Sequence, residues 1–485
     1  MESNRQRDSH VRVPSGTMRL PSGKRVRSMP LPSHHNGSFW FHSLDDLPEP
    51  EAPASLPEAV DVAIVGGGFT GLWTAYYLNR HSPDLGIAVF EAETVGFGAS
   101  GRNGGWCMGM AEGIEERLHG PERERGLALL RAMQDTVDEI GRVCQAENID
   151  CHFAKGGTLG VATTERHAER FRAYVAAKHA LGFTDDDFTW LEPEESTKRI
   201  GVRPNFGASY TTHCAAIHPA RLVRGLGDTV RRKGVTIFER TPVTAIAPGR
   251  VETSRGAVRA GVVLRATEGY TDTIAGHRRR LAPVYTMMVA TEPLPAETWS
   301  ELGLARRETF ADGRRITIYG QRTLDDRLAF GGRIGYRFGS GIRPRVEPDD
   351  PGLDDVEASM RALLPAVGDA RVTHRWGGVL GVPRHGRPFV TFDRPTGFGA
   401  AGGYTGEGVG ASNLAARILT DLVLERDTPL VELAWVDDVP PKWPVEPFRW
   451  LGAKAITTLG ALADRKELRK NGRSRVAGPL FERIF

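Results

Sequence analysis

Residues 60–78 read VDVAIVGGGFTGLWTAYYL, and this stretch decides the fold. Its apolar start predicts a buried strand that ends in glycines, and the spacing of Leu72, Ala75 and Leu78 indicates a helix after the glycines. A second strand-like run, GIAVFE at 86–91, follows the helix. Strand, helix and strand in this order predict a βαβ unit.

Three glycines occupy the turn between the first strand and the helix. Gly66, Gly68 and Gly71 match the pattern GxGxxG. We expect Gly66 to permit the tight turn, Gly68 to let a pyrophosphate approach the backbone, and Gly71 to let helix and strand pack closely. The N-terminus of the helix then meets the phosphate charge. Phe69 and Thr70, inside the motif, complete this part of the predicted cofactor site.

A carboxylate follows where a dinucleotide site needs one. Glu91 ends the second strand, twenty residues after Gly71, and a carboxylate there accepts hydrogen bonds from a ribose diol. Its charge disfavours a 2′-phosphorylated ribose. We include its neighbour Ala92 in the site. FAD and NAD share this fingerprint, so the choice between them needs further residues.

Two more glycine-rich segments stand far apart, GFGASGRNGG at 96–105 and GGYTGEGVG at 402–410. The first suits a backbone wrapped closely around a flat ligand, and its alternative is a mobile surface loop. The second opens a predicted helix whose positive end suits an anionic ligand edge, and its alternative is a helix start with no ligand. The candidate cofactor-binding residues in these segments are Gly98, Ser100, Gly101, Arg102, Asn103, Gly104, Gly105, Gly403, Tyr404, Thr405, Gly406 and Gly408.

Length and composition limit the number of domains and the kinds of partner that the protein can have. A chain of 485 residues with 40% hydrophobic and 25% charged residues can form about two to three domains. The net charge is only +3 and basic residues are scattered among acidic ones, so we expect no nucleic-acid partner. No run approaches the roughly 18 apolar residues of a membrane span, and the N-terminus lacks a secretory apolar region. We therefore expect a soluble, cytoplasmic protein without a transmembrane segment.

The cysteines predict neither a disulfide framework nor a metal site. Cys107, Cys144, Cys151 and Cys214 lack CxxC spacing and the density of a secreted scaffold, so we expect free thiols. His213 adjoins Cys214, but no third ligand stands at metal spacing.

The segments GGGFTGLWTAYYL, GFGASGRNGGW and GYTGEGVG resemble the D-amino-acid-oxidase-like (DAO) family of FAD-dependent oxidoreductases. Its γ-glutamylputrescine oxidoreductase-like and glycine or sarcosine oxidase-like members are most similar in these motifs, and the resemblance covers roughly residues 38–425. It implies FAD as cofactor, with hydride transfer from the carbon beside an amine nitrogen to flavin N5 and hydrolysis of the resulting imine. It also implies that the backbone of Val243 meets the adenine and that Thr267 ends an FAD-contacting strand.

Nucleotide-type segments recur in three separated places, so we expect an α/β fold with a discontinuous Rossmann-like FAD-binding domain. The resemblance implies an inserted α+β substrate domain on a mostly antiparallel sheet. The expected ranges are 39–115, 200–280 and 370–430 for the FAD-binding domain, 150–200 and 281–365 for the substrate domain, 1–38 for a disordered extension and 431–485 for a helical C-terminal tail. The stretch Phe448–Lys470 is basic and partly amphipathic, and we expect it to pack on the FAD domain rather than on a membrane surface.

Departures from the sarcosine oxidase pattern bear on catalysis. GGRIGYRFG at 331–339 resembles a GxKxGYH segment in which the lysine assists oxygen reduction and the histidine faces the substrate. Arg333 and Arg337 occupy those positions. A guanidinium keeps the positive charge but cannot release its proton, so reactivity with oxygen is an open question.

Three other positions differ in the same comparison. Gly410 takes the place of a lysine that grips the substrate carboxylate, which favours an amine without an α-carboxylate. A flavin-linking cysteine would fall near Val379, which excludes a thioether there. Glu407 replaces a histidine, and it either receives a cationic amine or caps the helix. Arg333, Arg337 and Glu407 are our catalytic candidates.

Three functions follow from these residues. The first is an FAD-dependent amine oxidase, acting on a γ-glutamyl polyamine-like or secondary amine and reoxidised by O2. The second keeps the dehydrogenation of an amine or amino acid but passes electrons to a quinone or carrier protein. The third is a flavin-binding protein without turnover.

Overall fold

The structure is a computed structural model that describes residues 36–47, 49–51, 53–343, 345–470 and 478. The expected disordered extension at 1–38 therefore lies almost entirely outside the described residues. Its last part lies inside them, and there Asn36 and Ser38 are buried. These two residues belong to the folded chain because their side chains contact the backbone of Gly101.

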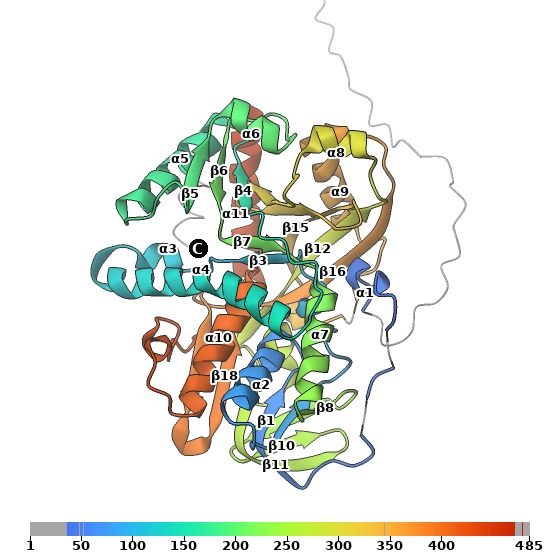
Figure 1. Cartoon of the computed structure of the whole chain (residues 1–485), viewed down its shortest axis with the longest axis vertical. Helices are drawn as coiled ribbons and strands as arrows, with labels where there is room; N and C mark the ends of the chain where they lie inside the picture. Colours follow the sequence, from blue (N-terminus) through green and yellow to red (C-terminus); the bar gives the residue numbers. More distant parts are fainter. Residues whose placement is uncertain (1–35, 48, 52, 344, 471–477, 479–485) are drawn as a thin grey trace, which may run out of the picture. The chain divides into compact units, whose positions relative to one another are not determined.

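The first sheet contains the predicted βαβ unit and occupies the lower half of Figure 1. Its parallel strands, in spatial order, are β8 (Thr236–Phe238), β2 (Ile87–Phe90), β1 (Ala59–Val65), β11 (Gly256–Arg265) and β18 (Phe398–Gly402). Antiparallel β17 (Phe389–Asp393) lies beside β18, and β9 (Val243–Ala247) and β10 (Arg250–Thr253) join β11. The last four residues of β1 (62–65), all apolar, are buried, as the strand prediction required.

Helices cover one face of this sheet (Figure 1). They are α2 (Phe69–His81), α7 (Pro219–Arg232) and α10 (Gly408–Val423), and α4 (Arg123–Ala146) packs on α10. In α7 the apolar residues Leu222, Leu226 and Val230 recur every four positions and are fully buried, which is the stripe of a helix that lies on a core.

The second sheet is mostly antiparallel and lies in the upper half of Figure 1. Its strands, in spatial order, are β16 (Val372–Pro383), β12 (Leu281–Thr291), β15 (Leu328–Tyr336), β14 (Ile318–Arg322), β13 (Thr309–Asp312), β4 (Thr158–Val161), β6 (Ala208–Thr211) and β5 (Phe188–Leu191). Helices α5 (Glu165–Ala180), α8 (Ala296–Leu302) and α9 (Pro351–Leu363) belong to this part of the chain. The predicted fold class, a Rossmann-like domain with a mostly antiparallel substrate sheet, is confirmed.

Two strands depart from the expected domain ranges. β6 falls within 200–280 and β16 within 370–430, the ranges assigned to the FAD-binding domain, yet both pair in the second sheet. β16 joins β12 along the whole length of that strand, so its backbone hydrogen bonds place it there. The rest of the domain division stays a prediction.

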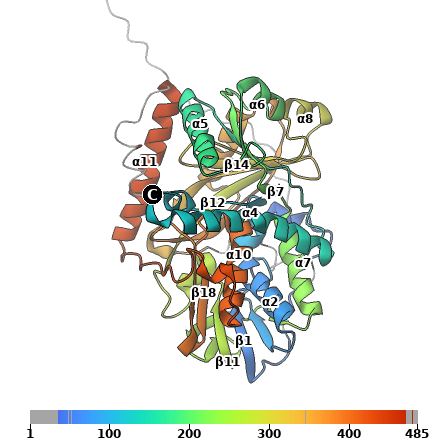
Figure 2. The ribbon, with the colours of Figure 1, turned by 60° about the vertical axis from the view of Figure 1, so that its left-hand side comes forward.

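The remaining elements are short, apart from the C-terminal helix. They are α1 (Phe39–His42), α3 (Ile114–Arg117), α6 (Pro193–Arg199), the pair β3 (Trp106–Met108) and β7 (Cys214–Ala216), and α11 (Phe448–Lys470). Figure 2 shows α11 running alongside α5 and the second sheet. We expected this stretch to pack on the FAD domain, and Arg449 near its start does pair with Asp272, in the range 200–280. Its far end lies on the second sheet, where Asp464 accepts hydrogen bonds from the backbone of Arg315 and Ile316, next to β14.

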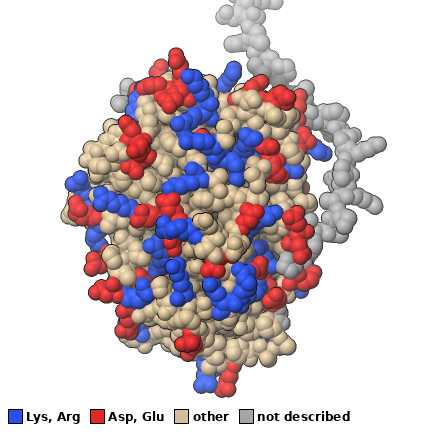
Figure 3. Space-filling model, in the orientation of Figure 1, with Lys and Arg blue, Asp and Glu red and all other residues tan. Residues whose placement is uncertain are grey.

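The surface carries charges of both signs. Figure 3 shows basic and acidic side chains intermingled over the face it draws. Among the described helices none is both long and apolar enough to cross a bilayer. The four cysteines are buried and free.

Candidate active site

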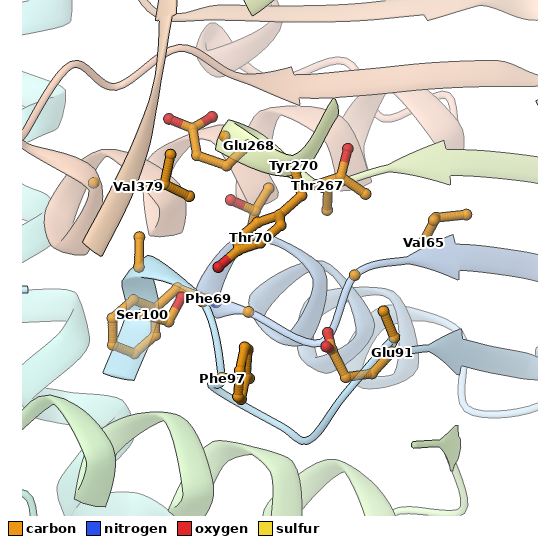
Figure 4. A pocket seen from close by; sticks show the side chains of 18 of the residues that line it. Val65, Phe69, Thr70, Glu91, Phe97, Ser100, Thr267, Glu268, Tyr270 and Val379 are labelled. Atoms are coloured by element: carbon orange, nitrogen blue, oxygen red, sulfur yellow. Dashed lines mark hydrogen bonds between the residues drawn. The ribbon is translucent and has the colours of Figure 1, made fainter. Parts of the chain in front are cut away.

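A cavity of about 410 Å³ lies at the carboxyl ends of β1, β2 and β11 (Figure 4). This edge of a parallel sheet is where doubly wound folds bind their ligands. Many predicted cofactor-binding residues line it together: Gly66, Gly68, Phe69, Thr70, Glu91, Ala92, Gly98, Ser100, Asn103, Val243, Thr267, Tyr404, Gly406 and Gly408. Val379, the position of the absent flavin-linking cysteine, lines it as well.

The first glycine motif has the geometry that GxGxxG predicts. Gly66 has a φ of +111°, and a Cβ there would lie 2.5 Å from the carbonyl oxygen of Ala266. A Cβ on Gly71 would lie 2.0 Å from the carbonyl oxygen of Gly66, so only glycine lets α2 approach the turn. Gly68, the residue before α2, offers no side-chain cap. Ser100 Oγ accepts from Phe69 N at 2.9 Å instead, and the electropositive start of α2 lies beside the cavity.

Glu91 is held by backbone at the end of β2. Its Oε2 accepts from Gly67 N at 2.7 Å and its Oε1 from Glu93 N at 3.0 Å. Burial raises the pKa of Glu91 to about 7 against these two donors. The carboxylate keeps free lone pairs that can accept hydrogen bonds from ribose hydroxyls.

The two distant glycine-rich segments meet at one cavity. Asn103 of the first segment and Tyr404 of the second both line it. The hydroxyl groups of Thr70 and Tyr404 lie 2.9 Å apart, which ties the second segment to α2. The expectation that both segments border one ligand site is consistent with this arrangement.

Glu268 is a site residue that the sequence did not reveal. Its carboxylate accepts from Gly403 N at 2.9 Å and from Tyr404 N at 3.3 Å, and it lines the cavity opposite Glu91 (Figure 4). Burial raises its pKa to about 7. It directly follows Thr267, but no local pattern indicates that its side chain crosses to the other segment.

The predicted residues that do not line the cavity are Gly71, Gly101, Arg102, Gly104, Gly105, Gly403 and Thr405. Arg102 lies just behind the lining and is only 2% exposed. Its guanidinium is 4.6 Å from the centre of the Phe97 ring, and its Nε and Nη2 have no hydrogen-bond partner among the described residues. Burial lowers the pKa of this arginine. Tyr270, which lines the cavity, has a buried hydroxyl that is likewise unpartnered within the described chain.

These orphaned donors fit an anionic dinucleotide. A buried cation without a carboxylate partner is costly unless a negative group lies near it. The electropositive start of α2 adds a second preference for negative charge. Glu91 supplies the acceptor that a ribose needs. The lining residues are therefore our candidates for holding FAD.

The segment before β1 supports the cofactor loop from behind. Trp40, 1% exposed, donates from Nε1 to the carbonyl of Asn103 at 2.7 Å. Ser38 Oγ donates to the carbonyl of Gly101 at 2.8 Å, and Asn36 Nδ2 donates to the same carbonyl at 3.2 Å. The sequence indicated only that the aromatic residues near Trp40 are apolar, not that they brace this loop.

Of the two candidate arginines, the structure describes the side chain of Arg337 only. Arg333 lies in β15, and its side chain falls outside the described residues. Arg337 follows β15 and was expected to face the substrate. It pairs with Asp350 at 3.1 Å and stands 5.2 Å from the centre of the Tyr285 ring. Arg337 is not among the residues that line the cavity, and its role toward a substrate stays a prediction.

Glu407 immediately precedes α10 between two lining glycines. Its side chain makes no capping hydrogen bond, so the interpretation as a helix cap is wrong. Burial, with a further contribution from the charge of Glu112, raises the pKa of Glu407 to about 7. Glu407 in turn adds to the rise that burial imposes on Tyr319, whose pKa is about 12. The charge of Glu407 therefore acts on a tyrosine of the second sheet.

Tyr319 connects that sheet to the first glycine-rich segment. Its hydroxyl lies 2.9 Å from that of Thr286, and its ring meets Trp106 edge to face at 6.0 Å. A Cβ on Gly104 would lie 2.6 Å from the Tyr319 ring. The second sheet thus approaches the cofactor loop closely at Gly104.

Gly410 leaves no room for an anchoring lysine. A Cβ there would lie 2.5 Å from the carbonyl oxygen of Met108. A side chain at this position would displace the backbone of β3. Among the described residues no group of three or more His, Cys, Asp or Glu side chains is arranged for a metal ion.

Comparisons with known proteins agree with this geometry. The DAO family of FAD-dependent oxidoreductases matches residues 61–422. The chain is 26% identical to the probable oxidoreductase OrdL of Haemophilus influenzae and 27% identical to γ-glutamylputrescine oxidoreductase of Escherichia coli, in each case over 81% of this chain and 89% of that protein. Glycine oxidase from Geobacillus kaustophilus has the same fold, with a TM-score of 0.66 at 20% identity over 79% of this chain and 100% of that one. The family match spans most of the sequence, so the chain belongs to the DAO family of FAD-dependent oxidoreductases.

Proposed function

We propose that this FAD-dependent oxidoreductase oxidises the C–N bond of a small cationic amine, such as a γ-glutamyl polyamine or a secondary amine. The observation that carries the proposal is Glu407, a carboxylate between two glycines that line the cavity. Burial first, and then the charge of Glu112, raise its pKa to about 7. Within the described chain no cation pairs with it. A positively charged substrate would stabilise the ionised carboxylate.

FAD would be held by the cavity lining. The diphosphate would lie against the backbone of Gly66 and Gly68 at the start of α2. Glu91 would accept hydrogen bonds from the ribose, and the backbone of Val243 would contact the adenine. The segments at 98–105 and 402–408 would enclose the flavin. Bound FAD supplies the acceptor for a hydride from the carbon next to the amine nitrogen, and water hydrolyses the released imine.

The chain's own residues would orient the amine. Glu407 would bind an ammonium group of the substrate, and Tyr319 would bound the space beside it. The absence of a side chain at Gly410 favours a substrate whose acidic group, if any, lies away from the reacting carbon. No side-chain base is needed once the reacting nitrogen is neutral.

For the return of the reduced flavin to its oxidised form, we propose first that O2 is the electron acceptor and that hydrogen peroxide is released. Arginine instead of lysine at position 333 favours an alternative, in which electrons pass to a quinone or a carrier protein. Turnover under air with stoichiometric peroxide supports the oxidase. Anaerobic turnover with an artificial acceptor, together with slow reoxidation in air, supports the dehydrogenase.

The decisive experiment is anaerobic bleaching of the flavin absorption by a library of amines and amino acids. Cationic amines should bleach the wild type, and Glu407→Gln should weaken their binding while the protein keeps its flavin. Glu425→Gln, a change at an exposed surface carboxylate, is the matched control. The proposal fails if neutral or anionic amino acids bleach the flavin better than cationic amines, or if the two variants behave alike.

A further inference from the structure

Helix α11 turns an apolar face to solvent. Phe448 is 65% exposed, Leu451 50% and Leu462 51%. With Ala455, which is also exposed, they recur at spacings of three, four and seven residues. Such spacing puts side chains on one side of a helix. We call Phe448, Leu451, Ala455 and Leu462 the outer face of α11.

The side of α11 that faces the protein is charged. Arg449, 5% exposed, pairs with Asp272 at 3.3 Å. Near the other end, Glu467 pairs with Arg315 at 2.9 Å and with Arg170 of α5 at 2.8 Å. A helix on a globular surface ordinarily buries its apolar stripe and exposes its charges. Ion pairs hold this helix on its buried side, which also includes Ala463, while its largest exposed side chains are apolar.

The exposed charges around the outer face have one sign. On the described part of α11 they are Lys454, Arg465 and Lys466, whereas both acids, Asp464 and Glu467, are buried. Lys442, before the helix, is exposed too. The outer face is thus an apolar strip with a basic border.

Two more exposed apolar residues lie close to the start of the helix. Val445 is 54% exposed and Phe338 63%. The Phe338 ring lies 6.2 Å from the Trp450 ring, centre to centre, so the loop after β15 adjoins the start of α11. Isolated exposed apolar residues are ordinary, but a contiguous group with a polar border marks an interaction surface.

We propose that the outer face of α11 docks on an anionic lipid surface, with the helix lying in the plane of the interface. Apolar side chains inserted at the headgroup boundary, bordered by lysine and arginine, are the features that bind such a surface. A second copy of this chain is less suited, because a symmetric contact would bring the same basic border against itself. The exposed basic residues match negative headgroups instead.

Docking would bring the lipid close to the cofactor cavity. Asp272, which holds Arg449, directly precedes the lining residues Thr273 and Ile274. The loop that carries Phe338 continues to Ile342, another lining residue. A lipid-soluble electron acceptor would therefore have a short approach to the site. The docking itself does not depend on which amine is oxidised.

The test is sedimentation of the full-length, flavin-loaded chain with vesicles of phosphatidylcholine, alone or mixed with phosphatidylglycerol. The wild type should sediment with the mixed vesicles and not with phosphatidylcholine alone, and salt should release it. Leu451→Ser combined with Leu462→Ser should abolish sedimentation. Leu324→Ser, at a leucine that is 57% exposed between β14 and β15, should leave it unchanged.

A charge series gives a second measurement. Lys454→Gln and Lys466→Gln should each weaken binding by about fivefold, as expected for one lysine at an anionic surface. Flavin absorbance and circular dichroism of every variant check that the chain is folded. The proposal is overturned if the wild type ignores anionic vesicles, if Leu324→Ser matches the α11 variant, or if that variant only converts a dimer to a monomer in gel filtration.

Discussion

Thr70 and Tyr404 place their hydroxyl oxygens 2.9 Å apart although 334 positions separate them in the sequence. Thr70 belongs to the first glycine motif, and Tyr404 to the segment before α10. Both residues line the cavity. This contact therefore holds the glycine turn expected to bind the diphosphate next to the segment expected beside the flavin.

Removal of this hydrogen bond should destabilise the chain and loosen the cavity together. Tyr404→Phe and Thr70→Val each break it, and a double-mutant cycle should give a coupling of about 0.5–1.5 kcal/mol in the free energy of unfolding. Denaturant titration of the four proteins measures it. Additive effects would mean that the two hydroxyls do not act on each other.

Glu91→Ala should weaken FAD binding. The carboxylate would lose charged hydrogen bonds to the ribose, each worth about 1.5–3 kcal/mol, or roughly 10- to 100-fold in Kd. Flavin fluorescence on titration of the apoprotein measures the change. Glu58→Ala, at a carboxylate whose side chain is 88% exposed at the edge of β1, serves as control. An unchanged Kd for Glu91→Ala would remove Glu91 from the cofactor site.

The glycine turn and both glycine-rich segments could be predicted because glycine spacing reports backbone conformation directly. Glu268 could not, since its partners Gly403 and Tyr404 lie on a distant segment. The strand β16 was misplaced for a related reason: its apolar pattern identifies a strand, but only long-range pairing with β12 identifies the sheet.

The same limit explains the outcome for the catalytic candidates. Family motifs gave the positions of Arg337 and Glu407, but not their partners. Asp350, which pairs with Arg337, follows it by 13 residues across a loop that no motif describes. Glu407 remained between two interpretations until the structure showed that it does not cap α10.

Binding of a cationic ligand should strengthen as pH rises through about 7. The pKa of Glu407 is raised to about 7, so the carboxyl is neutral below this pH and attracts a cation only above it. For a ligand with a permanent trimethylammonium charge, affinity should rise about tenfold between roughly pH 6 and 8. Calorimetric titration at several pH values measures this without interference from a titrating amine.

Two variants separate Glu407 from other titrating groups. Glu407→Gln should make the affinity independent of pH in this range. Glu112→Gln should move the midpoint to lower pH, because the charge of Glu112 contributes to the raised pKa. A midpoint that stays at the wild-type value in both variants would assign the titration elsewhere.

Trp40 should act as a positioning residue for the cofactor loop. Trp40→Phe keeps an aromatic ring beside Trp376 but leaves the carbonyl of Asn103 without its donor, at a cost of about 1–3 kcal/mol. Part of this cost should appear as weaker FAD binding and an altered flavin spectrum, because Asn103 lines the cavity. Trp299→Phe removes an equivalent bond, Nε1 to the carbonyl of Asp326 at 3.0 Å, far from the cavity lining. Trp299→Phe should lower the Tm and leave the FAD affinity unchanged. If both variants lost FAD affinity equally, Trp40 would have only a general packing role.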